Sequence, residues 1–191
     1  MSMEYTIIRS RRRTISLEIT DDAKLLVRAP MRVPKYEIER FIKEKEAWIV
    51  KHIAKVQARR DKVSAIEPIS GEELKRLADE ALRVIPKKVA YYADIIGVTY
   101  GRITIRNQRT VWGSCSSKGN LNFNCLLMKA PEHVRDYVVV HELCHRKEMN
   151  HSKRFWELVE IVIPDHKVCR KWLKEEGGVY LASMRQDGQI Y

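Results

Sequence analysis

Three histidines and one glutamate stand close together in the stretch "VVVHELCHRKEMNHSKRFW", which runs from Val138 to Trp156. His141 and His145 are four residues apart, so on a helix their imidazoles lie one above the other and can bind one metal ion. Glu142 directly follows the first histidine, where its carboxylate would face a water on that ion rather than the ion itself. The spacing predicts half of a tetrahedral zinc site with a general base beside it.

A catalytic zinc site has three protein ligands and one water, so a third ligand is needed. His151 is the candidate, because Asn150 before it is a residue type that often ends helices and turns the chain. A short turn after Glu148 would bring His151 back to the first two histidines. The valines at positions 138–140 give the helix an apolar face that would bury it. The alternative is that these three are surface or hydrogen-bonded histidines. We interpret the other histidines as surface residues rather than ligands: His52, His133 and His166.

The first third of the chain predicts a small unit of strands and one helix. Ile15, Leu17 and Ile19 alternate with polar residues, so we expect a small antiparallel β-sheet of two or three strands in the first thirty residues. An amphipathic helix opens at Pro34, and its apolar spacing of three and four continues to Ile53. This helix is expected to pack on the strands.

Residues 61–73 mix charge, proline and glycine without a period, so we place a domain boundary there, between residues 1–66 and 67–191. The second domain begins with a helix that starts near Ser70 or Gly71, bends or breaks at Pro86 and ends at Gly97. Strands follow in "TYGRITIRN" and "GNLNFNCLLM", and helix resumes after Pro131. The order of elements predicts an α+β fold.

The formal charge of +11 and the pI near 9.6 imply attraction to phosphate, nucleic acid or acidic partners. Much of this charge lies in Arg9–Arg13 and Gln57–Lys62, where a solvated surface is the simpler interpretation. No apolar run approaches the roughly 18 residues of a membrane span, and no signal sequence is apparent, so we expect a cytoplasmic protein. Four cysteines stand apart without a CxxC pair, which argues against a zinc ribbon or a redox motif: Cys115, Cys125, Cys144 and Cys169.

The stretches "VWGSCSSKGNLNFNCLLMKAP", "YVVVHELCH" and "NHSKRFW" resemble the YgjP-like metallopeptidase family, which is related in its helix and ligand pattern to the SprT-like and minigluzincin proteins. The N-terminal "RRRTISLEI" and "KEKEAWI" are similar to the leading segment of that family, so the resemblance covers nearly the whole chain. It implies that His141, His145 and His151 hold zinc and that Glu142 is the motif glutamate.

The resemblance also implies a gluzincin-like core, in which a small sheet has its edge strand above the metal and is backed by the HExxH helix. We expect "GNLNFNCLL" to be that edge strand, where an extended substrate could add its backbone hydrogen bonds. Asn124 and the turn Trp112-Gly113-Ser114 occupy motif positions of the family. Structural support is our first interpretation of both, and substrate binding is the alternative for Asn124. The donor that stabilises oxygen charge in the transition state could be Tyr137, Asn124 or a nearby arginine.

Three functions remain open on the sequence alone. The first is a zinc-dependent peptidase that acts on peptides or unfolded protein, with Glu142 taking a proton from the zinc-bound water. The second keeps the metal but hydrolyses nucleoside triphosphates such as UTP, because members of this family have also been described as pyrophosphohydrolases. No phosphate-binding glycine loop or carboxylate cluster supports it. The third is a nucleic-acid-binding module with a structural metal, which would not need Glu142 and lacks any known binding motif.

The closing segment Gly177–Tyr191 is too short to have a core of its own. A related minimal metallopeptidase group keeps itself latent with C-terminal segments. One hypothesis therefore places this tail along the active-site cleft, and the alternative packs it on the N-terminal strands.

Overall fold

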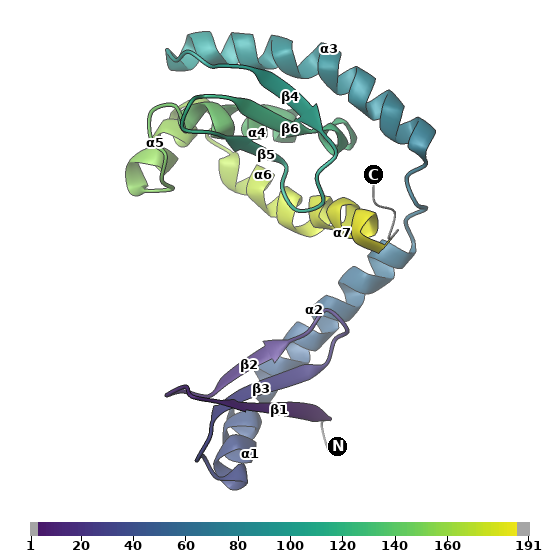
Figure 1. Cartoon of the computed structure of the whole chain (residues 1–191), viewed down its shortest axis with the longest axis vertical. Coiled ribbons are helices and arrows are strands. Elements are labelled where there is room, and N and C mark those ends of the chain that lie inside the picture. The colour runs from purple at the N-terminus through teal and green to yellow at the C-terminus, as the bar shows by residue number, and fades with distance from the viewer. Residues whose placement is uncertain (1–3, 187–191) are drawn as a thin grey trace. The chain divides into compact units, whose positions relative to one another are not determined.

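The computed structural model describes residues 4–186 of the chain, which divides into two compact units, Met1–Ala65 and Ile66–Tyr191 (Figure 1). Each unit has a hydrophobic core of its own. Both units combine a three-stranded sheet with helices, so the expected α+β class is confirmed. Among the residues described, no helix has the length and apolar character needed to cross a membrane.

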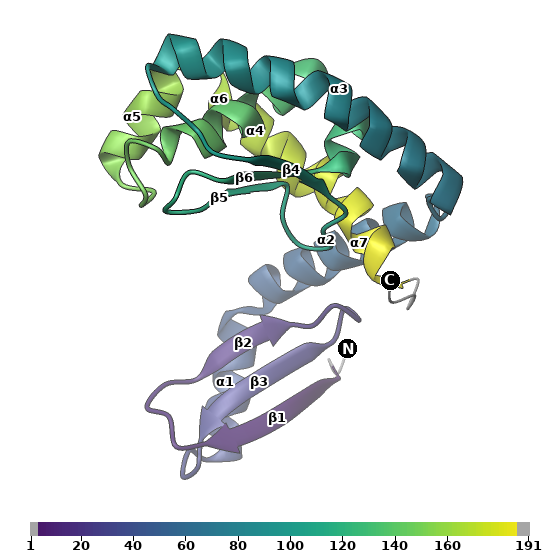
Figure 2. The same cartoon turned by 45° about the horizontal axis from the view of Figure 1, so that its top comes forward.

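The first unit opens with strands β1 (Tyr5–Ser10), β2 (Ser16–Ile19) and β3 (Leu25–Pro30), arranged in the order β1-β3-β2 (Figure 2). β2 and β3 form an antiparallel hairpin, but β1 pairs with β3 in parallel. The expected antiparallel sheet is therefore wrong for β1. The chain reverses after β1 and again after β2, so β3 runs in the same direction as β1. In the sheet, β3 lies between β1 and β2. As the central strand, β3 buries every second residue.

The helical segment expected from Pro34 onward is two helices, α1 (Lys35–Glu44) and α2 (Glu46–Ser64). Ile38, Ile42 and Ile49 are buried against β3, as expected from the apolar spacing. One continuous helix would place Lys45 in the same stripe, between Ile42 and Ile49. The break falls at Lys45, whose N–H bonds to the carbonyls of Phe41 and Ile42. The lysine therefore stays exposed.

The second unit begins with α3 (Gly71–Ile96), whose ends follow the expected signals. The Ser70 hydroxyl accepts a hydrogen bond from the N–H of Glu73, and Gly97 ends the helix with φ of 69°. Pro86 lies inside the helix, which continues for ten residues beyond it. One face of α3 is buried against the core at spacings of three and four: Leu77, Ala81, Ile85, Val89, Ala93 and Ile96.

The second sheet has strands β4 (Ile103–Arg106), β5 (Gly113–Cys115) and β6 (Leu121–Asn124) in the order β4-β6-β5. β6 is parallel to β4 and antiparallel to β5. The expectation that "GNLNFNCLL" forms an edge strand is therefore wrong, because β6 is paired on both sides. Its buried Leu121 and Phe123 suit a central strand. The edge strand that packs on the histidine helix is β5.

Short helices complete the second unit: η1 (Cys125–Lys129), α4 (Glu132–Cys144), α5 (Lys153–Val162), α6 (His166–Trp172), the π-helical η2 (Leu173–Gly177) and α7 (Gly178–Gln186). The tail expected in the cleft or on the N-terminal strands begins as η2 and α7, and Leu181 belongs to the core of this unit. Gly177 lies so close to Trp112 that an added Cβ would be 2.9 Å from its ring. The rest of that hypothesis concerns residues 187–191, which lie outside the described residues.

Candidate metal centre

The direction of the histidine side chains is set by the burial of α4. Val138, Val139, Val140 and Leu143 are all buried, so the helix is surrounded by protein on most sides. His141 projects from the half-buried side that remains, and His145 is the residue that ends the helix. The i, i+4 spacing then places their rings 5.0 Å apart.

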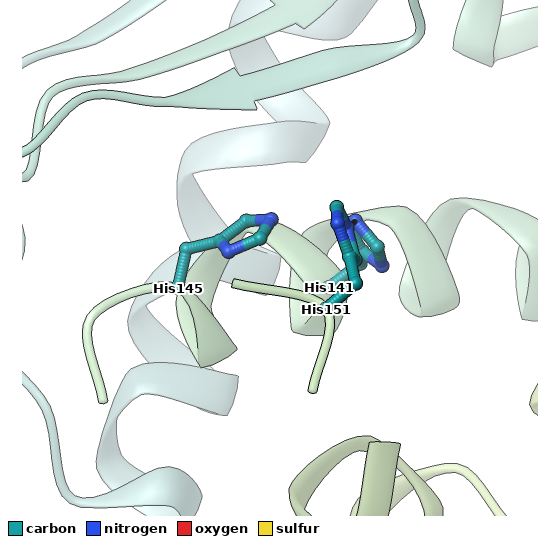
Figure 3. A group of neighbouring side chains, drawn as sticks. All are labelled: His141, His145 and His151. Atoms are coloured by element: carbon teal, nitrogen blue, oxygen red, sulfur yellow. Dashed lines mark hydrogen bonds between the residues drawn. The ribbon is translucent and has the colours of Figure 1, made fainter. Parts of the chain in front are cut away.

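His151 returns to these two rings after a short turn that follows α4 (Figure 3). It stands next to Ser152, whose hydroxyl accepts a hydrogen bond from the N–H of Phe155 and so fixes the start of α5. The Phe155 ring is fully buried and lies 4.9, 4.6 and 4.7 Å from the rings of His141, His145 and His151. One phenyl ring thus supports all three imidazoles. Phe155 was not expected from the sequence, because its contacts depend on how α5 folds back on α4.

The three imidazoles fit a single metal ion. One nitrogen of each lies within 4.8 Å of the other two, and the Nε2 atoms of His141 and His151 are 3.0 Å apart. Two imidazole nitrogens on a tetrahedral zinc are roughly 3.4 Å apart, since Zn–N is about 2.0–2.1 Å. The Nδ1 of His145 donates to the carbonyl of Glu148, and the Nδ1 of His141 contacts the Tyr137 hydroxyl at 3.3 Å. These contacts turn the Nε2 atoms inward.

The surroundings keep the imidazoles of His141 and His151 in the form that binds metal. Burial and the neighbouring His145 and His151 lower the pKa of His141 to about 3. Burial, followed by the charge of His145, also lowers the pKa of His151. A neutral imidazole has a lone pair to donate, so the site is poised for a cation at neutral pH.

Glu142 is buried beside the cluster and packs on β5. Its side chain is 6% exposed, and this burial raises the pKa of the carboxyl to about 8. At Gly113 an added Cβ would lie 2.8 Å from Oε1 and 2.9 Å from Cγ of Glu142. A larger residue would force the carboxylate or the edge strand to shift, which gives the glycine of "WGS" a physical reason. The expected turn is wrong for Gly113 and Ser114, which belong to strand β5.

Two of the suggested oxygen-stabilising residues have other contacts. Asn124 is fully buried, its amide donates to the carbonyls of Gln108 and Val111, and its Oδ1 accepts from the N–H of Leu126. These contacts support the first interpretation, structural support of the 108–112 loop, and substrate binding by Asn124 stays a prediction. Tyr137 is buried, and its hydroxyl contacts Nδ1 of His141.

His52, His133 and His166 lie outside the metal cluster. His52 stacks on Trp48 and contacts its backbone carbonyl, and His133 is exposed, as expected. The surface interpretation is wrong for His166, which is 3% exposed and stacks on Trp156. Of the cysteines, three are buried and Cys115 is half-buried, and all are free thiols.

A buried helix that presents His-Glu-x-x-His, with a third histidine returned by the chain, defines the site of a metal-dependent hydrolase. The sequence matches the family described as YgjP-like, metallopeptidase domain, over residues 13–78 and 74–176. The chain belongs to this YgjP-like metallopeptidase family.

Two crystal structures of metallopeptidase zymogens are similar to part of the chain. Abylysin of Pyrococcus abyssi is 25% identical, with a TM-score of 0.44 over 49% of this chain and 96% of its own. Jannalysin of Methanocaldococcus jannaschii is 19% identical, with a TM-score of 0.38 over 53% of this chain and 95% of its own. No curated protein matches the sequence.

Proposed function

We propose that the chain is a zinc-dependent peptidase in which His141, His145 and His151 hold the metal and Glu142 is the general base. The observation that carries this proposal is the convergence of three imidazole nitrogens within 4.8 Å, with a buried carboxylate on the residue after the first of them. Three nitrogen ligands are the donor set of catalytic zinc sites, which leave one position open. Membership of a metallopeptidase family supports the same chemistry.

Glu142 takes the proton from the attacking water and passes it to the leaving amine. Burial raises the pKa of this carboxyl above its ordinary value, which makes it a stronger proton acceptor than an exposed glutamate. Gly113 leaves the space that the carboxylate occupies, because an added Cβ there would lie 2.8 Å from Oε1. Bound zinc would supply Lewis-acid polarisation of the scissile carbonyl and a lower pKa for the attacking water.

The open edge of β5 is the place for an extended substrate in this proposal. Trp112 accepts a hydrogen bond from the N–H of Asn124, and Ser116 donates to the carbonyl of Asn120, at the two ends of the β5–β6 ladder. Bonded pairs alternate along an antiparallel ladder, so the backbone groups of Gly113 and Cys115 point away from β6. A peptide added at this edge would pass beside Glu142, and this supports a peptide over a nucleotide as substrate.

The test compares the parent protein with Glu142→Gln on one unfolded polypeptide and on UTP. We expect the parent to cleave the polypeptide, the chelator 1,10-phenanthroline to stop it, and Glu142→Gln to keep its zinc while losing at least a hundredfold in kcat. Glu157→Gln on α5 is the matched control, because that carboxylate is exposed and pairs with Lys153. Glu142-dependent release of pyrophosphate from UTP, without cleavage of the polypeptide, would overturn the peptidase proposal.

A further inference from the structure

A guanidinium group stands one ring away from the histidine cluster. Arg170 of α6 has its Cζ 4.1 Å from the centre of the Trp156 ring. The Trp156 ring in turn stacks on His151, with centroids 5.6 Å apart, and lies 5.9 Å from the ring of His141. Stacking on an indole holds a guanidinium in one plane without occupying its N–H donors.

The side chain of Arg170 has donors to offer. It is exposed, and within residues 4–186 it forms no ion pair with a carboxylate. Arg146, a second cation near the site, differs in this respect. Its guanidinium donates to the carbonyls of Thr99 and Ser117 and so belongs to the scaffold.

The Glu142 carboxylate packs on Gly113 of β5, whereas the Arg170 guanidinium stacks on Trp156 of α5. The base and the guanidinium thus have different neighbours around the imidazoles, the base on β5 and the guanidinium on Trp156.

We propose that Arg170 is a catalytic residue whose guanidinium donates to the substrate carbonyl oxygen as that oxygen becomes negative. This inference rests on the proposed peptidase function. When the water oxygen bonds to the carbonyl carbon, the electron pair of the C=O bond moves to oxygen, where Arg170 meets it. As the pair returns, the C–N bond breaks and the amine leaves with the proton that Glu142 took from the water.

The variants Arg170→Gln and Arg170→Lys test this role, with Lys171→Gln as the control on the next, exposed position. The substrate is an N-acetylated, C-amidated peptide without acidic residues, built around a bond that the parent cleaves. We expect Arg170→Gln to lose about a hundredfold in kcat, as removal of one oxyanion donor does, with KM within threefold and zinc content unchanged. Arg170→Lys should regain part of the loss, and Lys171→Gln should match the parent.

A phosphonamidate analogue of the same peptide gives a second measurement that a structural role would not move. Its affinity should fall with Arg170→Gln in proportion to kcat/KM, because it resembles the transition state. The inference is overturned if kcat is unchanged, if zinc is lost, or if the defect appears in KM and only for substrates with a free carboxylate. A parent that cleaves no peptide would instead contradict the proposed function itself.

Discussion

At the proposed catalytic centre, Gly113 packs so closely on Glu142 that a Cβ at position 113 would lie 2.8 Å from Oε1. Gly113→Ala must therefore displace the carboxylate or the edge strand. We expect kcat/KM for a cleaved peptide to fall at least tenfold, a loss of about 1.4 kcal/mol in transition-state stabilisation. Zinc content should stay at the parent level, because the ligands are not touched.

Gly71→Ala is the matched control for this prediction, because nothing lies within 4 Å of a Cβ added at the start of α3. Peptidase assays and elemental analysis of both variants are sufficient. Parent-like activity of Gly113→Ala would show that the carboxylate does not need its present position.

The cluster residues could be proposed from the sequence because their relation is local. A spacing of four on a helix brings His141 to His145, and His151 is only six residues further. Phe155 and Arg170 gave no comparable signal. Their contacts depend on how α5 and α6 fold back on α4, which no short-range pattern encodes.

At the scale of elements, α3 and α4 are joined by a charged contact on Lys88. Its Nζ lies 2.6 Å from Asp136 and 2.8 Å from Glu132, and its side chain is 18% exposed. Burial alone would lower the pKa of Lys88, but the hydrogen bonds and charges of the two carboxylates outweigh it and raise this pKa. The hydrogen bond from Lys88 lowers the pKa of Glu132.

Lys88→Met should lower the free energy of unfolding at pH 7 by about 1–3 kcal/mol, because Asp136 loses its partner in a largely buried place. A lowered carboxyl pKa contributes stability above its unfolded value of 4.5, and a raised lysine pKa contributes stability below its unfolded value of 10.5. The difference from the parent should therefore be largest between these values and shrink as the pH falls below 4.5. Denaturant titrations across pH measure it.

Lys87→Met is the control for the α3–α4 contact, because Lys87 is the neighbouring position and is exposed. An equal destabilisation in both variants would mean that the loss comes from the helix surface. A difference that stays constant from pH 7 to the lowest pH at which both variants fold would contradict the assigned ion pair.

Element boundaries followed from the sequence more easily than element pairing. Ser70 and Gly97 marked the ends of α3 because capping is local. The position of β6 between β4 and β5, and the parallel pairing of β1 with β3, join segments that turn signals do not relate. The charge of Lys45 could have indicated the break between α1 and α2.

At the scale of the whole molecule, most of the net positive charge lies in one unit and the candidate metal centre in the other. Residues 1–65 contain 16 of the 36 lysines and arginines but 9 of the 25 acidic residues, and so carry +7 of the net +11. The candidate metal centre lies entirely within residues 66–191, which have a separate core. Attraction of the chain to polyanions is therefore expected to come mainly from the first unit.

A fragment of residues 66–191 should fold, hold one zinc and cleave a short peptide with kcat/KM within threefold of the full chain. The fragment should elute from a heparin column at a lower salt concentration, because its net charge is +4 against +11 for the full chain. Circular dichroism measures folding, elemental analysis measures the zinc content, and the peptide assay measures kcat/KM. A folded fragment without zinc would contradict the assignment of a complete site to the second unit.

The most direct test of the central claim is anomalous diffraction at the zinc absorption edge from crystals of the whole protein. The account predicts one anomalous peak per chain, about 2.0–2.1 Å from the Nε2 atoms of His141, His145 and His151, and its loss in His151→Ala. A peak coordinated by other residues, or a fully occupied peak that survives in His151→Ala, would contradict the three-histidine zinc centre.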